Sequence, residues 1–428
     1  MFKRRTSNTD LLATGSWQAR QGSTTGARVS RESKRALLKY LLLAVLAASL
    51  FYNYVGWSRI AGHSEEPGAT AKTWSYEIVK PEPTNHRDNT QKQTLGKEKA
   101  ALVMLARNKE LGDALHSIRA VEDRFNRNYH YPWVFMNDEP FTEEFMELTS
   151  GLASGPVEYA QIPKEHWSVP DWLDVPKAQK SMEDMVAKGI IYGGSVSYRH
   201  MCRFNSAFFF RQEVLAKYDW YWRVEPSVDF YCDIDYDPFA FMRENKKTYG
   251  FVMSLYEYEA TIPTLWKATA DFIKDHPDYL ASNNSLDFLI DGQAPSAEGD
   301  KSIPEKGYNL CHFWSNFEIA DLNFWRSKTY LDYVDHLDSL GGFFYERWGD
   351  APVHSLAVSL FLPKDKVHHF NDISYRHAPY TRCPQDEESY ANGRCVCPIP
   401  KTQNFDTDGY SCLPKWWAVA GKEDRRYN

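Results

Sequence analysis

The chain has 428 residues, of which 43% are hydrophobic and 25% are charged, so its composition is that of a folded protein and excludes a fully disordered one. Its 50 Lys and Arg against 57 Asp and Glu give a net charge of −7, which argues against a surface that binds nucleic acid throughout. The first 39 residues carry nine basic side chains and two acidic ones. The other 389 residues are therefore acidic, with a net charge of −14.

Residues 40–57 form an uncharged run, YLLLAVLAASLFYNYVGW, directly after this basic segment. As a helix with a rise of about 1.5 Å per residue, the run would span roughly 27 Å, close to the thickness of a bilayer core. Because the positive charges precede it, the positive-inside bias predicts a cytosolic tail over 1–39, an uncleaved transmembrane signal anchor over 40–57 and a lumenal remainder. The alternative is a buried helix of a soluble domain.

Residues 58–97 are polar, contain three prolines and have no sustained apolar period, which predicts a flexible stem. We expect a single lumenal domain over 98–428. It begins with the continuous apolar run at 100–106, which is typical of a strand buried on both faces, and a helical pattern follows at 109–125.

The alternation of strand and helix continues along the chain and predicts an α/β domain with a mainly parallel sheet. The next pair is a strand over 132–138 and a helix over 141–148. Further strands are predicted at 157–162, 220–224, 249–255 and 367–370, and further helices at 174–189, 264–275, 327–339 and 352–361.

All seven cysteines lie on the predicted lumenal side, where disulfides can form. Four of them fall within residues 383–412, and we expect them to staple a C-terminal segment with little regular structure. Four cysteines allow three pairings, and only a bond between Cys395 and Cys397 is disfavoured. A zinc site is the alternative, but the spacing matches no common zinc pattern.

Acidic residues after a strand are needed wherever a divalent ion bridges a diphosphate, because Mg²⁺ and Mn²⁺ prefer oxygen ligands. The pair Asp233 and Asp235 fits this pattern. The alternative is a capping role, in which Asp235 or Asp237 caps a helix that begins near Pro238. Glu225 is a rival carboxylate, because it follows the predicted strand at 220–224 and so lies at the sheet edge where open α/β folds bind ligands.

Several long strings occur in an order that is specific: YRHMCRF, YDWYWRVEPSVDFYCDIDYD, YNLCHFWSNFEIADLNFWRS, GGFFYERWGDAPVHSLAVSLFLP and HHFNDISYRHAPYTRCP. Over about residues 98–398 the chain resembles the fungal α-1,2-mannosyltransferases of the Kre2/Mnt1/Ktr type. The resemblance implies a GT-A glycosyltransferase domain in a type II Golgi membrane protein. It also implies transfer of mannose from GDP-mannose, with Mn²⁺, to a mannose hydroxyl of a glycoprotein glycan, with retention of configuration.

The resemblance assigns the metal to Glu225 and His377 and the reacting centre to Glu318. Glu318 would either attack the anomeric carbon or stabilise positive charge while the leaving phosphate deprotonates the acceptor. Asp350 would serve acceptor hydroxyls or act as a base. On residue type alone, His377 could be an ordinary surface histidine, and Asp350 could cap a helix beginning at Pro352.

The resemblance also implies three substrate-binding residues. Arg107, directly after the first strand, would contact GDP, and Tyr198 and Arg203 would lie near the diphosphate and the transferred sugar. The alternatives are a buried tyrosine and a structural ion pair. Two other functions fit the sequence, namely a mannosylphosphate transferase of the same family and a non-catalytic, lectin-like protein that binds glycans.

Overall fold

The structure, a computed structural model, describes residues 98–291, 302–400 and 403–420. The predicted cytosolic tail (1–39), transmembrane anchor (40–57) and stem (58–97) lie outside these residues. Within the described ranges, no helix is both long enough and apolar enough to cross a membrane.

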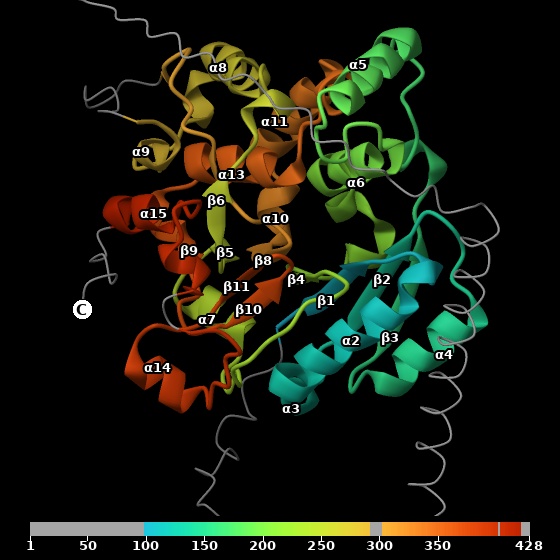
Figure 1. The fold of residues 1–428 in the computed structure, drawn as a ribbon, viewed down its shortest axis with the longest axis vertical. Coiled ribbons are helices and arrows are strands. Elements are labelled where there is room, and N and C mark those ends of the chain that lie inside the picture. The colour runs from blue at the N-terminus through green and yellow to red at the C-terminus, as the bar shows by residue number, and fades with distance from the viewer. Residues whose placement is uncertain (1–97, 292–301, 401–402, 421–428) are drawn as a thin grey trace, which may run out of the picture. The chain divides into compact units, whose positions relative to one another are not determined.

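A seven-stranded sheet forms the centre of the domain, in the order β3-β2-β1-β4-β8-β5-β9 (Figure 1). Six strands run in one direction, and β8 is antiparallel to its neighbours β4 and β5, so the predicted mainly parallel sheet is confirmed. The strands are β1 (Ala100–Leu105), β2 (Trp133–Asn137), β3 (Val157–Gln161), β4 (Trp220–Val224), β5 (Tyr249–Phe251), β8 (Phe317–Asp321) and β9 (Val367–His369).

Helices cover both faces of this sheet (Figure 1). On β1, Leu102 and Met104 pack with helices α2 and α4, whereas Ala101 and Val103 pack in a second core with α6, α8, α11 and α13. The continuous apolar run of β1 is therefore explained by burial on both sides. These helices are α2 (Leu111–Val121), α4 (Glu143–Leu152), α6 (Val196–Ala207), α8 (Leu265–Asp275), α11 (Lys328–Ser339) and α13 (Asp350–Phe361).

The shorter helices join these layers or cover the edges of the domain. They are α3 (Arg127–Tyr129), α5 (Val175–Ala187), α7 (Pro238–Glu244), α9 (Leu286–Leu289), α10 (Leu322–Trp325), α12 (Gly342–Tyr345), α14 (Glu387–Asn392) and α15 (Leu413–Val419). Each of the predicted helices is present in the structure, with ends that differ by a few residues.

One predicted strand, 249–255, is wrong as a single element. Residues Tyr249–Phe251 form β5 of the large sheet, but Ser254–Tyr256 form β6, which pairs with β7 (Cys311–Phe313) in a separate two-stranded sheet. The chain changes sheets between the two halves, and the apolar pattern continues through the change because both halves are buried.

The C-terminal cysteines do not staple only one another. Cys383 bonds to Cys397, but Cys395 bonds to Cys232 and Cys412 bonds to Cys311. The prediction that these four cysteines pair within residues 383–412 is therefore wrong for two of them, Cys395 and Cys412. Cys395 and Cys397 are not bonded to each other, as expected. The bonds to Cys232 and Cys311 attach the C-terminal segment to the rest of the domain. The hairpin of β10 (Tyr375–His377) and β11 (Tyr380–Arg382) precedes this segment.

Candidate active site

A cavity of about 740 Å³ opens at the carboxyl edge of the large sheet. It is lined by residues at or directly after the ends of β1, β2 and β4, at 106–107, 137–138 and 225–227. The loop at 314–316, before β8, and the first residues of α13 complete it. This is the edge at which open α/β sheets bind their ligands.

Aromatic side chains line much of the cavity. Their flat faces suit the apolar faces of sugar rings and the plane of a base. The aromatic lining residues are Trp167, Tyr192, Tyr198, Tyr256, Tyr258, Trp314, Tyr380 and Tyr410.

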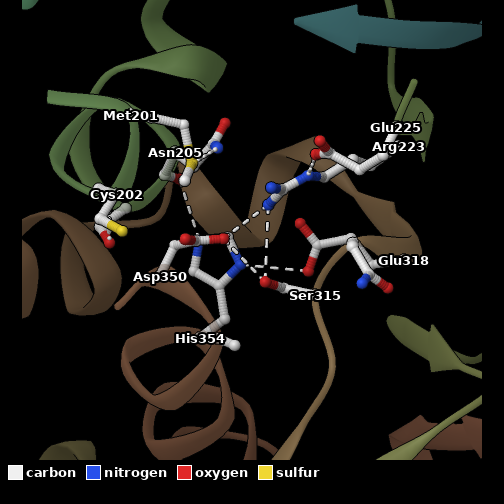
Figure 2. Close-up of polar contacts among 12 residues, drawn as sticks. Met201, Cys202, Asn205, Arg223, Glu225, Ser315, Glu318, Asp350 and His354 are labelled. Carbon is white, nitrogen blue, oxygen red and sulfur yellow. Dashed lines mark hydrogen bonds and ion pairs between the residues drawn. The ribbon is translucent and has the colours of Figure 1, made fainter. Parts of the chain in front are cut away.

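Arg223, near the end of β4, joins two of the predicted carboxylates (Figure 2). Its Nε donates to Glu225 Oε1 at 2.7 Å, and its Nη1 donates to Asp350 Oδ2 at 2.6 Å. Asp350 Oδ2 also accepts a hydrogen bond from the Ser315 hydroxyl at 2.7 Å. One guanidinium therefore fixes both carboxylates at the floor of the cavity, in the geometry of charge-assisted hydrogen bonds.

The charges of this cluster support one another. Burial alone would raise the pKa of the Asp350 carboxyl, but the positive charge of Arg223 and the hydrogen bonds hold that pKa below its usual value. Burial alone would lower the pKa of Arg223, and the negative charges of Glu225 and Asp350 instead raise it well above its usual value. Asp350 is thus an ionised acceptor of hydrogen bonds.

Asp350 is the first residue of α13 and is not its cap. The helix begins at Asp350, with Gly349 at the capping position, and the described residues show no side-chain capping bond there. The alternative that Asp350 caps a helix starting at Pro352 is therefore wrong. Its carboxylate turns to Arg223 and Ser315 instead of to the helix backbone (Figure 2).

Glu225 and His377 both line the cavity, so the structure brings the two predicted metal ligands to one site. His377 Nδ1 lies 3.2 Å from the carbonyl oxygen of Ala378. Because a carbonyl oxygen can only accept, Nδ1 carries the proton of the neutral ring and Nε2 carries the lone pair. Burial lowers the pKa of His377, although nearby Glu225 opposes the shift. A neutral imidazole is the form that binds metal.

The residues present fit an ion that shares its ligands with a nucleotide. Arg223 occupies only Oε1 of Glu225, so Oε2 can face a metal. In the described part of the chain, no group of three or more His, Cys, Asp or Glu side chains is placed to hold a metal ion. One carboxylate and one imidazole leave most of an octahedron to phosphate oxygens and water.

The rival metal motif at Asp233 and Asp235 lies elsewhere. Asp233 makes ion pairs with Arg124, at 2.7 Å, and with Arg394. Asp237 accepts hydrogen bonds from the backbone NH groups of Phe239 and Ala240 and so caps α7. The capping alternative is thus confirmed for Asp237.

Glu318 lies beneath the cavity and not among its lining residues. Its side chain is fully buried on β8, directly opposite Arg223 of β4. Oε1 accepts a hydrogen bond from the Tyr221 hydroxyl at 2.7 Å, and Oε2 lies 3.1 Å from His354 Nδ1. A small void of about 10 Å³ touches both Glu318 and Arg223.

Two of the three predicted substrate-binding residues line the cavity. Arg107 follows β1, and its Nη2 donates to Glu110 Oε1 at 2.5 Å. Tyr198, on α6, stacks on Tyr192 with 4.5 Å between ring centroids. The guanidinium of Arg347, a buried residue that also lines the cavity, lies 5.0 Å from the centre of the Tyr198 ring.

The structure does not bring Arg203 to the cavity. Its Nε and Nη2 donate to the two carboxylate oxygens of Asp338 at 2.7 and 2.8 Å, and its Nη1 donates to the Ser168 carbonyl. Because the guanidinium is committed to these partners and the residue is buried, the ion-pair alternative describes it better than substrate binding does.

Sequence reasoning missed Arg223, Ser315 and His354. For Arg223 a signal existed, because a charged residue inside an otherwise buried strand needs a partner of opposite charge. For His354 the signal was its spacing of four residues from Asp350, which places both on one face of a helix.

The fold and this site define an α/β glycosyltransferase. The model of the family described as Glycolipid 2-alpha-mannosyltransferase matches residues 67–421. The chain belongs to this family.

Individual relatives agree with this assignment. The chain is similar to Glycolipid 2-alpha-mannosyltransferase 2 of Candida albicans, with 54% identity over 76% of this chain and 68% of the relative. It is 48% identical to Alpha-1,2 mannosyltransferase KTR1 of Saccharomyces cerevisiae, over 89% and 92% of the two chains. The solved structure of core-mannan synthase A from Aspergillus fumigatus, in its Mn/GDP form, superposes with a TM-score of 0.70 at 41% identity and covers 77% of this chain and 87% of that one.

Proposed function

We propose that this protein transfers mannose from GDP-mannose to a mannose hydroxyl of a glycan, forming an α-1,2 linkage with retention of configuration. The observation that carries the proposal is the cluster of Arg223, Glu225 and Asp350 on the floor of an aromatic cavity, in a chain of this family. The names of the relatives and the Mn/GDP form of the Aspergillus fumigatus enzyme support the donor and the bond formed.

Glu225 and His377 would hold a Mn²⁺ ion in this site. A bound divalent ion supplies positive charge that offsets the diphosphate as it leaves. Arg107, at the end of β1, is placed to contact the nucleotide, and Tyr198 to contact the phosphate or the transferred sugar.

We propose that Asp350 binds the acceptor sugar. Its carboxylate lines the cavity, is ionised and is fixed by Arg223 and Ser315, so it can accept a hydrogen bond from an acceptor hydroxyl. Glu318 is fully buried one layer below, which favours stabilisation of positive charge at the anomeric carbon over direct attack on it.

The wider organisation is part of the same proposal. We propose a GT-A domain that faces the lumen of the Golgi, anchored by residues 40–57 and spaced from the membrane by a stem over 58–97. The apolar run, the basic residues before it and the resemblance to type II enzymes support the topology, and the three disulfides of the described residues suit an oxidising compartment.

Product analysis tests this function. The purified full chain is incubated with GDP-mannose, Mn²⁺ and methyl α-mannoside, and the linkage and anomeric configuration of the product are determined. We expect an α-1,2-linked dimannoside from the wild type and a rate lower by roughly 100- to 1,000-fold from Glu318→Gln. A product that contains phosphate would identify a mannosylphosphate transferase. Glycan binding without any transfer would identify a lectin-like protein, and either result would overturn the proposal.

A further inference from the structure

His354 connects the floor of the active site to its buried carboxylate. It lies on α13 one helical turn after Asp350, so both side chains project from the same face of the helix (Figure 2). The His354 side chain is fully buried. Its two ring nitrogens contact Glu318 of β8 and the backbone carbonyl of Asn205 in α6.

These contacts determine how many protons the pair holds. His354 Nε2 lies 3.0 Å from the carbonyl oxygen of Asn205, which can only accept, so Nε2 carries a proton. A neutral ring with its proton on Nε2 has a bare lone pair on Nδ1. That lone pair would face Oε2 of Glu318 at 3.1 Å, and two lone pairs make no hydrogen bond. One further proton must therefore lie between Nδ1 and Oε2.

The surroundings of Glu318 favour the ionised carboxylate, and hence a proton on the ring. Its other oxygen, Oε1, accepts a hydrogen bond from the Tyr221 hydroxyl at 2.7 Å. The residue directly opposite Glu318 on the neighbouring strand is the cationic Arg223. An ionised carboxylate that is fully buried needs a close cation and hydrogen bonds to offset its lost hydration.

We propose that His354 is a positioning residue that carries this proton on Nδ1 and keeps Glu318 ionised and fixed beneath the reacting centre. The role of Glu318 in catalysis rests on the proposed function. The opposing interpretation is purely structural, because the His354 ring also stacks on Trp325 with 4.3 Å between centroids. A packing role would change stability without acting through Glu318.

Two substitutions separate the contacts of the ring. In His354→Asn the side-chain amide can reach the place of Nδ1 and donate to Glu318. In His354→Gln it can reach the place of Nε2 and donate to Asn205 but gives Glu318 no donor. We expect His354→Gln to lower kcat by roughly 10- to 100-fold with an unchanged KM for GDP-mannose, because a hydrogen bond to a charged group is lost. His354→Asn should restore a large part of this loss.

The same change at His336 is the matched control. His336 Nε2 also lies near a backbone carbonyl oxygen, that of Ala268 at 3.2 Å, but outside the cavity lining. His336→Gln should leave kcat at the wild-type value. Equal losses of kcat in His354→Gln and His354→Asn would overturn the proposal.

A double-mutant cycle tests whether His354 acts through Glu318. In a Glu318→Gln background, His354→Gln should cause no further fall in the residual kcat. A further fall as large as in the wild-type background would show that His354 acts independently of Glu318.

Spectroscopy of the full chain tests the proton itself and requires no transfer activity. With ¹⁵N-labelled histidine, we expect the His354 ring to carry a proton on both nitrogens. That ring should become neutral in Glu318→Gln. If no doubly protonated ring of the wild type is lost in Glu318→Gln, the proposal is wrong. A wild type that shows the doubly protonated ring but transfers no mannose would refute the proposed function and not this inference.

Discussion

Arg223 determines the charge of the site at the scale of single residues. It is the cation that lies between Glu225 and Asp350, and it faces Glu318 across the sheet. The guanidinium and the Asp350 carboxylate are both largely buried, so their ion pair must compensate for the hydration that each has lost.

Arg223→Met should therefore destabilise the protein as well as inactivate it. We expect the free energy of unfolding to fall by about 3 kcal/mol, because two carboxylates lose their common cation. Chemical denaturation measures this loss. The control is Arg211→Met, because Arg211 pairs with the exposed Asp335 and should contribute less than about 1 kcal/mol. Equal stability of the two variants would contradict this account.

The resemblance supplied positions that the structure largely brings to one cavity, but it did not supply the partners of each side chain. Glu225, Asp350 and His377 come from distant parts of the chain, yet all three line one cavity. The resemblance alone could not show that Arg203 is held by Asp338, because that pairing depends on how α6 packs against α11. Tertiary packing decides which of several arginines can reach the cavity.

At the scale of elements, the close packing of β5 against Phe370 makes a glycine necessary. A Cβ added to Gly250 would lie 2.4 Å from the Phe370 ring, which is fully buried. Gly250→Ala should lower the free energy of unfolding by about 1 to 3 kcal/mol, because neither β5 nor the ring can move freely.

Gly112, on α2, is the matched control for this prediction. A Cβ there would meet no atom within 4 Å, so Gly112→Ala should be neutral or should stabilise by up to about 1 kcal/mol. Thermal or chemical unfolding of both variants measures the difference. If Gly250→Ala were as stable as Gly112→Ala, the packing described for β5 would be wrong.

The elements that the sequence predicted are those whose apolar pattern is continuous or regular. The strand β1 is such a run, buried by helices on both faces. The strand β8 was not predicted, because its sequence FEIAD places a glutamate in a strand that is buried almost throughout. Helix α6 was missed for the same reason, since Arg199 and Arg203 interrupt its apolar face although both are buried. Buried polar side chains hide the local apolar pattern in both elements.

At the scale of the whole molecule, two disulfides attach the C-terminal segment to the rest of the domain. The bond from Cys311 to Cys412 joins β7 to the start of α15 across 101 residues, whereas that from Cys383 to Cys397 spans 14. Chain entropy predicts that removing both cysteines costs about 5 kcal/mol for the long loop and about 3 kcal/mol for the short one. Unfolding of the Cys311→Ala/Cys412→Ala and Cys383→Ala/Cys397→Ala variants gives the order, and the reverse order would contradict this expectation.

The sequence could indicate the compartment of these bonds but not their partners. Cys232 and Cys395 are separated by 163 residues, and only the folded chain brings them together. The domain class was accessible because the alternation of strands and helices is a property of the entire chain. The shape of the cavity was not accessible, because it depends on how distant parts of the chain pack around the sheet edge.

The most direct test of the central claim is to measure GDP binding to the full chain by titration calorimetry, with and without Mn²⁺. We predict that Mn²⁺ strengthens GDP binding at least about tenfold in the wild type, and that Glu225→Ala combined with His377→Ala abolishes this gain while weak binding of GDP alone persists. The account is contradicted if the double variant binds GDP with Mn²⁺ as tightly as the wild type, or if the wild type does not bind GDP.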